Sequence, residues 1–394
     1  MTRVQRQLLV LSLLVVALGV LAWRWHGSSA MRDAVDGART HIEQNEPELA
    51  LRAIRPYLDA GRRDGELWLV AAKAYRLLDD PAKAMQCLDT AAAYGFESAD
   101  VDLERGLALA AFGRYRDAET LLEASPTKEA AAALATIHLQ LFEMEKALNN
   151  LSTWKQLAPD DPRPHIIAGS VWAQALEHEK AVEQYRGALK VRPDFFDARL
   201  LLATSLVELG EIDEAAKLLR ECLDIRPQSA EAAWRLATCE VERGDAAAAR
   251  ELLEKLLKEH PHITVALVEL AKIELDDGDT ELAERLLTDA VARAPMNDAA
   301  QYNLSLVLDR LGKSDEAAEH MTRARELQES RRRLADAMER VNADPTDVDA
   351  RCEAADLCIE LGESQQAANL FAAVLARDPQ NARAKEGIKK LNEG

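Results

Sequence analysis

Aromatic side chains are scarce in this sequence. They make up 5% of its 394 residues, whereas apolar residues make up 48%, and alanine and leucine fill the difference. This composition predicts an all-α protein built from thin helix pairs rather than one thick core. No glycine-rich phosphate loop, Gly-x-Ser-x-Gly or His-Glu-x-x-His pattern occurs, so common motifs of nucleotide-binding, hydrolytic and zinc-dependent enzymes are missing. We therefore expect no catalytic residues and no enzyme activity.

Cysteine and histidine are too few and too scattered to suggest a metal site. None of the five cysteines has a Cys-x-x-Cys neighbour, and each falls within a predicted helix as a small core residue. Cys352 and Cys358 point about 120° apart on one helix, which is poor placement for a disulfide. Only His260 and His262 are close in sequence, and zinc takes three or four ligands. We expect no disulfide framework, no metal and no cofactor.

Basic residues are outnumbered by acidic ones. The sequence has 49 lysines and arginines against 68 aspartates and glutamates, which gives a net charge of −19. An acidic surface repels phosphate backbones, so we expect no nucleic-acid partner. The acidity has two interpretations that the sequence leaves open: solubility of a long exposed surface, or attraction of a basic partner.

The amino terminus contains a run without charged residues, after Arg3 and Arg6. Its apolar part, Leu8 to Trp23, would span about 24 Å as a helix, slightly short of a ~30 Å hydrocarbon core. Trp23 and Trp25 suit the membrane interface. We predict that residues 1–30 form a single-pass membrane anchor through residues 8–23, with the remaining chain on the extracytoplasmic, periplasmic side. Two alternatives stay open: a secretory signal cleaved after Ser28-Ser29-Ala30, and a buried terminal helix.

The centre of the chain is a repeat array. Prolines recur at a constant step of 34 residues, at 159, 193, 227, 261 and 295, and alanines stand twelve residues before them, at 147, 181, 215, 249 and 283. Between these markers Gly210, Gly244 and Gly278 interrupt an apolar pattern with a period near 3.6. Each unit is therefore predicted to be a helix, a turn and a second helix.

Extending the phase outward gives ten units with small residues at two fixed positions. Position 20 is alanine in all ten, and position 8 is alanine, glycine or serine in all ten, which suits helices that approach closely. The position-20 residues are Ala50, Ala84, Ala118, Ala147, Ala181, Ala215, Ala249, Ala283, Ala317 and Ala367; the position-8 residues are Ala38, Ala72, Gly106, Ala135, Gly169, Ala203, Ala237, Ala271, Ser305 and Ala355.

This period and spacing resemble the tetratricopeptide repeat family over residues 31–381. The unit at Gly65 matches the family pattern with Trp68, Ala72, Tyr75 and Ala84; the unit at Pro162 matches it with Gly169, Ala181, Tyr185, Ala188 and Pro193. The resemblance implies a right-handed superhelix of paired helices whose concave groove binds partner proteins or peptides. It implies no chemistry.

The predicted domain organisation follows from the alignment of the repeats at positions 8 and 20. The units are residues 31–64, 65–98, 99–127, 128–161, 162–195, 196–229, 230–263, 264–297, 298–347 and 348–381. The second helix of the ninth unit is expected to be extended, and residues 382–394 are expected to form a capping helix. Glycine commonly fills the turn at position 15, where a left-handed backbone is required. Phe142 and Leu176 fit that conformation poorly, so these two turns are expected to depart from the pattern.

The resemblance implies that positions 2, 5, 9, 12 and 13 of each first helix line the groove. Position 9 gives a row of hydroxyls, Thr136, Ser170, Thr204 and Thr238; position 13 gives Gln140, Gln174, Glu208, Glu242 and Asp276; position 5 gives an apolar strip, Ile166, Leu200, Trp234, Val268 and Tyr302. The hydroxyl row is equally compatible with drift at a tolerant site. The aligned acids favour a partner with a basic segment, although Arg235 and Lys272 lie nearby and are expected to neutralise them in part. Some family members clamp a peptide carboxylate with lysine at position 5 and asparagine at position 9, and this sequence has neither.

We interpret the chain as a non-catalytic, membrane-anchored scaffold or adaptor that binds partner proteins or peptides in its groove. One alternative is a cleaved, soluble periplasmic form of the same repeat protein. Another is a non-catalytic subunit or assembly factor of a membrane enzyme or export machine. The sequence does not name the partner.

Overall fold

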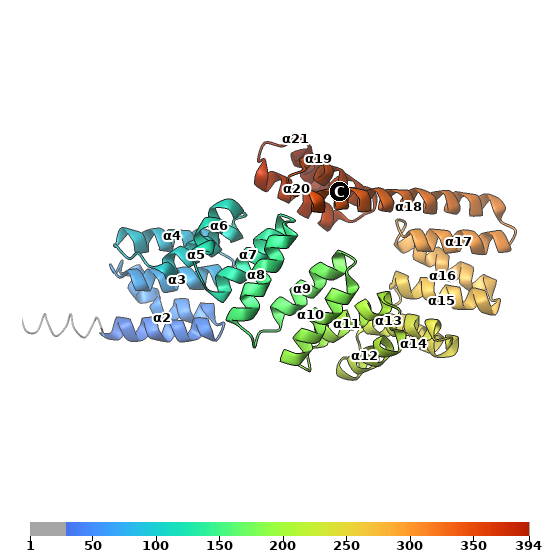
Figure 1. The fold of residues 1–394 in the computed structure, drawn as a ribbon, viewed down its shortest axis with the longest axis horizontal. Helices are drawn as coiled ribbons and strands as arrows, with labels where there is room; N and C mark the ends of the chain where they lie inside the picture. Colours follow the sequence, from blue (N-terminus) through green and yellow to red (C-terminus); the bar gives the residue numbers. More distant parts are fainter. Residues whose placement is uncertain (1–28, 394) are drawn as a thin grey trace, which may run out of the picture. The chain divides into compact units, whose positions relative to one another are not determined.

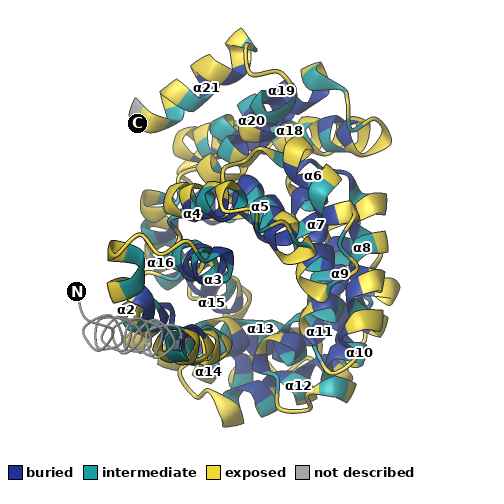
Figure 2. Cartoon of the chain, turned by 90° about the vertical axis from the view of Figure 1, so that its left-hand side faces the viewer, coloured by how far each residue is buried: buried dark blue, intermediate teal, exposed yellow. Residues whose placement is uncertain are grey.

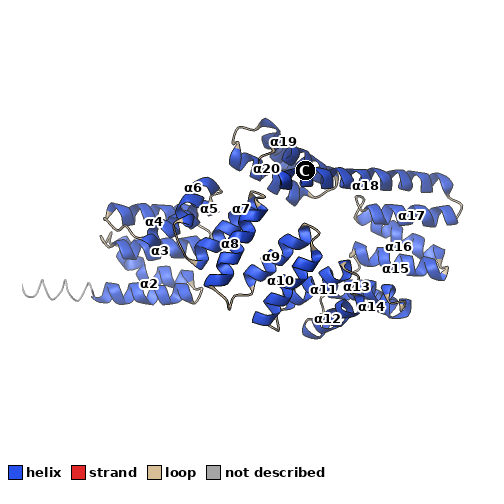
Figure 3. Cartoon of the chain, in the orientation of Figure 1, coloured by secondary structure: helices blue, strands red, loops and turns tan. Residues whose placement is uncertain are grey.

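The computed structural model describes residues 29–393, in which every regular element is a helix (Figure 3). Residues 29–43 are helical, and the helices that follow are α2 (Pro47–Asp59), α3 (Gly65–Leu77), α4 (Pro81–Ala93), α5 (Ala99–Ala111), α6 (Tyr115–Glu123), α7 (Lys128–Gln140), α8 (Met144–Leu157), α9 (Arg163–Gln174), α10 (His178–Val191), α11 (Phe196–Glu208), α12 (Ile212–Ile225), α13 (Ala230–Glu242), α14 (Ala246–Glu259), α15 (Thr264–Asp277), α16 (Thr280–Arg293), α17 (Asp298–Arg310), α18 (Ser314–Ala343), α19 (Val348–Glu360), α20 (Ser364–Arg377) and α21 (Ala382–Glu393). The predicted anchor, residues 8–23, lies outside the described residues. Among residues 29–393, no helix is both long and apolar enough to span a membrane.

Two compact units divide the chain between Leu134 and Ala135. In the first unit, α3 packs on α4 and α5 packs on α6. The α6 helix has only nine residues, in the unit that the sequence shows to be short. In the second unit, α9 to α20 form successive pairs, and Figure 1 shows the extended ninth second helix as α18, which has 30 residues.

The inner side of the second unit is formed by the first helix of each pair. Neighbouring first helices contact one another from α9 through α11, α13 and α15 to α17. The corresponding second helices, α10, α12, α14 and α16, make no comparable contact with each other in the described chain. Because one row of helices is closer together than the other, the array curves with α9, α11, α13, α15 and α17 on its concave face.

The small residues lie where helices of a pair meet. All ten position-20 alanines are buried, and eight of them are completely inaccessible. In Figure 2 buried residues follow these helix contacts while exposed residues cover the outward faces. Glycine is required where an aromatic ring fills the space, because a Cβ atom on Gly169 would lie 2.5 Å from Cε1 of Tyr185. The same reason explains the isolated Gly387 in α21, whose Cβ would lie 2.2 Å from Cε2 of Phe371.

The prediction that two turns depart from the pattern is wrong. Phe142 has φ 58° and Leu176 has φ 60°, the same left-handed conformation that Gly210 adopts at φ 76°. The hydrogen bonds of the turn are also the same: the Glu143 amide donates to the carbonyl of His138 at 2.8 Å, as Glu211 does at its own turn. A side chain in this conformation costs about 1–2 kcal/mol relative to the usual helical region. The geometry of the repeat therefore overrides the local preference of both residues.

Buried ion pairs connect consecutive helix pairs. The Arg250 side chain on α14 donates to Glu274 on α15 at 2.7 Å, and Arg76 on α3 donates to Glu104 on α5 at 2.7 Å. Glu104 and Glu274 are buried, so each carboxylate needs its arginine. Some of the acidic residues therefore contribute to the packing of the helices.

All five cysteines are buried and unbonded. Burial raises the pKa of the Cys87, Cys222 and Cys239 thiols to about 11, and that of Cys358 to about 12. Because the thiolate is the reactive form, these thiols are poorly reactive in the folded chain.

Candidate partner-binding groove

The predicted site residues lie on six first helices of the array. They are Thr136 on α7, Ser170 and Gln174 on α9, Thr204 and Glu208 on α11, Trp234, Thr238 and Glu242 on α13, Asp276 on α15 and Tyr302 on α17. Since α9 to α17 contact each other in sequence order, residues at one repeat position follow one another along the concave face. We call Glu208, Glu242 and Asp276 the acidic edge.

The acidic edge carries three exposed carboxylates. Within residues 29–393, none of the three has an ion pair or a side-chain hydrogen bond, whereas acids elsewhere in the array often do. Glu208 and Glu242 are also the last residues of α11 and α13. The carboxyl end of a helix is negative, so an acid there is unfavourable by about 0.3–1 kcal/mol. A cation from a partner would pair with these carboxylates and offset their unfavourable interaction with the helix dipole.

Two nearby cations, Arg235 and Lys272, are paired with acids outside the edge. Arg235 contacts Glu231 at 3.0 Å and Lys272 contacts Glu269 at 2.9 Å. Arg235 and Lys272 therefore make no direct ion pair with the acidic edge within the described residues.

In the repeats before and after the acidic edge, position 13 holds neutral or basic residues. Gln140 and Gln174 occupy position 13 before it, and Arg310 occupies that position after it. Nη1 of Arg310 donates to the carbonyl of Leu275 at 3.2 Å. At position 13 of the first helices from α7 to α17, acids thus occur on α11, α13 and α15.

Three hydroxyls of the row, those of Ser170, Thr204 and Thr238, already have partners within the array. Oγ1 of Thr204 donates to the Leu200 carbonyl at 3.0 Å and Oγ1 of Thr238 donates to the Trp234 carbonyl at 3.2 Å. The Ser170 hydroxyl lies 3.3 Å from the hydroxyl of Tyr185. Where the hydroxyl proton is used inside a helix, the oxygen remains as an acceptor. Thr204 and Thr238 can therefore accept a hydrogen bond from a basic side chain or an amide, but cannot also donate one.

The predicted apolar strip is interrupted. Leu200 and Val268 are 8% and 4% exposed, so they belong to the core and the prediction that they line the groove is wrong. Trp234 is half-buried, and the guanidinium carbon of Arg235 lies 4.4 Å from a ring centre, so one face of the indole is already covered. Tyr302 remains accessible at 41%.

Other apolar residues take the place of the buried ones. Val241, Val265 and Leu306 are exposed, at repeat positions 12, 2 and 9 of α13, α15 and α17. These positions are among those that the family resemblance assigns to the groove, so reading every groove position for apolar side chains would have found them. With Tyr302 they give four exposed apolar side chains at predicted groove positions of α13, α15 and α17.

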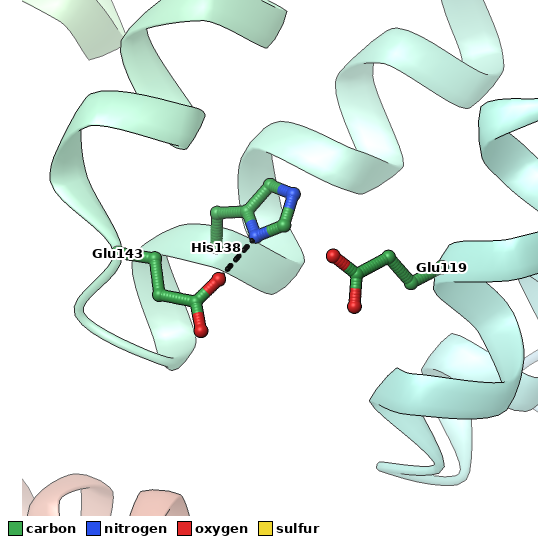
Figure 4. Close-up of side chains that lie close together, drawn as sticks. All are labelled: Glu119, His138 and Glu143. Carbon is green, nitrogen blue, oxygen red and sulfur yellow. Dashed lines mark hydrogen bonds and ion pairs between the residues drawn. The ribbon is translucent and has the colours of Figure 1, made fainter. Parts of the chain in front are cut away.

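A second polar group lies at the turn between α7 and α8. Figure 4 shows the His138 imidazole beside Glu143, with Nδ1 3.0 Å from a carboxylate oxygen. Glu143 also contacts Lys146 at 3.1 Å. His138 is almost completely buried, so this pair supports the turn and does not line the concave groove.

Family models described as tetratricopeptide repeat match residues 206–270 in one case, and residues 173–230 and 268–332 in another. A comparison with curated proteins found no match.

Similar solved structures include MamA, with 20% identity over 41% of this chain and 95% of that one, at a TM-score of 0.36. They also include YrrB, described as a TPR protein with an unusual peptide-binding site, with 17% identity over 45% and 92% of the two chains and a TM-score of 0.36. A human IFIT1 dimer with PPP-AAAA shows 17% identity over 87% and 89% of the chains, with a TM-score of 0.41.

Proposed function

We propose that the tetratricopeptide repeats of residues 173–332 make this chain a protein-interaction scaffold, and that its groove binds an amphipathic peptide segment with basic residues. The observation that carries the proposal is the acidic edge, where three consecutive first helices present carboxylates that have no partner in the described chain. A charged surface of one sign attracts and orients a partner of the other sign.

The chemistry beside the edge defines the partner further. Val241, Val265, Tyr302 and Leu306 offer apolar contact on the same series of helices. Thr204 and Thr238 offer acceptor oxygens. A helix with arginine or lysine on one face and apolar side chains on another would match the carboxylates, the apolar side chains and the acceptor oxygens, as in other cases where an amphipathic helix lies in a groove.

The position of the partner can be tested by photo-cross-linking. We expect a photoreactive residue at Glu242 to capture a synthetic peptide of alanine, leucine and arginine. The same residue at Glu254, which is exposed on the second helix α14, should capture little. Equal capture at both positions, or capture at Glu254 alone, would contradict binding in the groove.

We further propose that residues 8–23 attach this scaffold to a membrane and that the repeats lie on the extracytoplasmic side. The uncharged run Leu8–Trp23 supports the proposal. Mass spectrometry of the protein from its native membrane should find the amino-terminal segment intact. A mature chain that starts at Met31 would instead favour a cleaved signal and a soluble periplasmic scaffold.

A further inference from the structure

Two segments far apart in sequence meet within the second compact unit. Nη2 of Arg351 on α19 donates to the carbonyl of Leu141, 210 residues earlier, at 3.0 Å. The guanidinium carbon of Arg351 also lies 5.2 Å from the centre of the Phe142 ring. Repeats of a solenoid normally contact only their neighbours in sequence. This contact instead joins the α7–α8 turn to the end of the array.

An ion pair strengthens the contact. Nη2 of Arg377 on α20 lies 2.5 Å from Oε1 of Glu143, and the two side chains are 13% and 10% exposed. Arg351 itself is 1% exposed. Burial lowers the pKa of Arg351 to about 10, which still leaves it charged near neutral pH. Arg351, which is buried, and Arg377, which is half-buried, thus depend on groups of the α7–α8 turn, and separation of the segments would leave them without those partners.

The left-handed turn does not explain why residue 142 is a phenylalanine. Its left-handed backbone suits glycine, yet its ring packs against the core cluster of α18 to α21 that includes Cys352 and Phe371. Leu176 has the same backbone conformation in the next repeat, but its side chain is 79% exposed. The contact of the Phe142 ring with the distant helices therefore offsets the unfavourable backbone conformation of this residue.

The contact borders a space lined by apolar and carboxamide side chains. A pocket of about 680 Å³ lies beside it, lined by Phe142, Met144 and Trp172 from early helices and by Met338, Gln366 and Asn369 from late ones. Carboxamide side chains on its walls can exchange their contacts for water without the cost of exposing a charge. The two ends of the array thus meet through a few specific side chains next to a cavity, and not through a continuous packed core.

We propose that Phe142, Glu143, Arg351 and Arg377 form a latch that closes residues 135–394 into a ring and that can release to open it. In the closed state the latch couples the first and last repeats of this unit, which no contact between neighbouring repeats can do. Release leaves each helix pair intact, because the position-20 alanines and the ion pairs between neighbours are not involved. The latch therefore sets the curvature of the array independently of the stability of its repeats.

Distance measurement between spin labels at Asn149→Cys and Gln366→Cys tests the latch. Both positions are exposed, on α8 and α20, and the five native thiols are buried. We expect one narrow distance distribution for the parent chain. Phe142→Gly should add a longer and broader population, because glycine keeps the turn and removes the ring. A distribution for Phe142→Gly identical to that of the parent would overturn the proposal.

Leu176→Gly is the matched control, since it makes the same backbone change at a turn without a latch. This variant should leave the distance distribution unchanged. An opening of similar size would show that glycine alone loosens the array, and it would overturn the proposal. Hydrogen exchange gives a second readout: Phe142→Gly should speed exchange in α20 roughly tenfold while α11 to α14 exchange as in the parent. Unchanged exchange in α20 would also contradict a latch.

Discussion

Ala215→Leu should destabilise the array. Ala215 is completely buried on α12 within the core cluster of α10 to α13. Leucine adds three carbon atoms where no space exists, and such overpacking costs about 1–3 kcal/mol. Because a repeat array is stabilised by neighbour contacts, the damage should be local. Thermal unfolding should begin at a lower temperature, and hydrogen exchange should rise in α11 to α13.

Ala247→Leu provides the control for this prediction. Ala247 is exposed on α14, so the same added side chain should change the free energy of unfolding by less than about 0.5 kcal/mol. An unchanged melting curve for Ala215→Leu would contradict the assignment of position 20 to the helix contacts.

Replacement of the acidic edge should weaken partner binding without loss of structure. We expect glutamine at positions 208, 242 and 276 together to lower affinity for an arginine-containing amphipathic peptide. Exposed ion pairs contribute about 0.2–1 kcal/mol each, so the combined loss is roughly 3- to 150-fold. Stability should be unchanged or slightly higher, because Glu208 and Glu242 lie at the negative ends of their helices. Titration calorimetry measures the affinity, and circular dichroism checks the fold.

A second triple variant controls for net charge. Asp224, Glu254 and Glu281 are exposed on α12, α14 and α16 and make no ion pair within the described residues. Their replacement by glutamine removes the same three charges from the outer helices. Affinity should stay close to that of the parent. Equal losses in both triple variants would mean that only the overall charge attracts the peptide.

The repeat architecture was readable from the sequence because its signals are periodic. A 34-residue step in proline and alanine predicts the helix pairs, and Ala147, Ala215 and Ala283 at position 20 are buried. The prediction for the turn at Phe142 is wrong, and the residue that its ring contacts, Arg351 on α19, lies more than two hundred residues away in sequence. Local preference carries no information about such a distant contact.

The groove was predictable in part, for a similar reason. Repeat position places Glu208, Glu242 and Asp276 on one face, and the structure finds all three exposed. Burial, in contrast, depends on how neighbouring pairs pack, so Leu200 and Val268 were assigned to the groove although they belong to the core. The ion pairs of Arg235 and Lys272 with acids outside the edge likewise depend on side-chain placement that spacing does not specify.

The salt dependence of peptide binding tests the central claim most directly. Exposed charges are screened over about 10 Å at 0.1 M ionic strength, so binding through the acidic edge should weaken as salt rises. We predict a clear loss of affinity with salt for the parent chain and for the control triple variant. The triple variant of Glu208, Glu242 and Asp276 should bind more weakly at low salt and change little as salt is added. Identical affinities for that variant and the parent across the whole titration would contradict binding at the acidic edge.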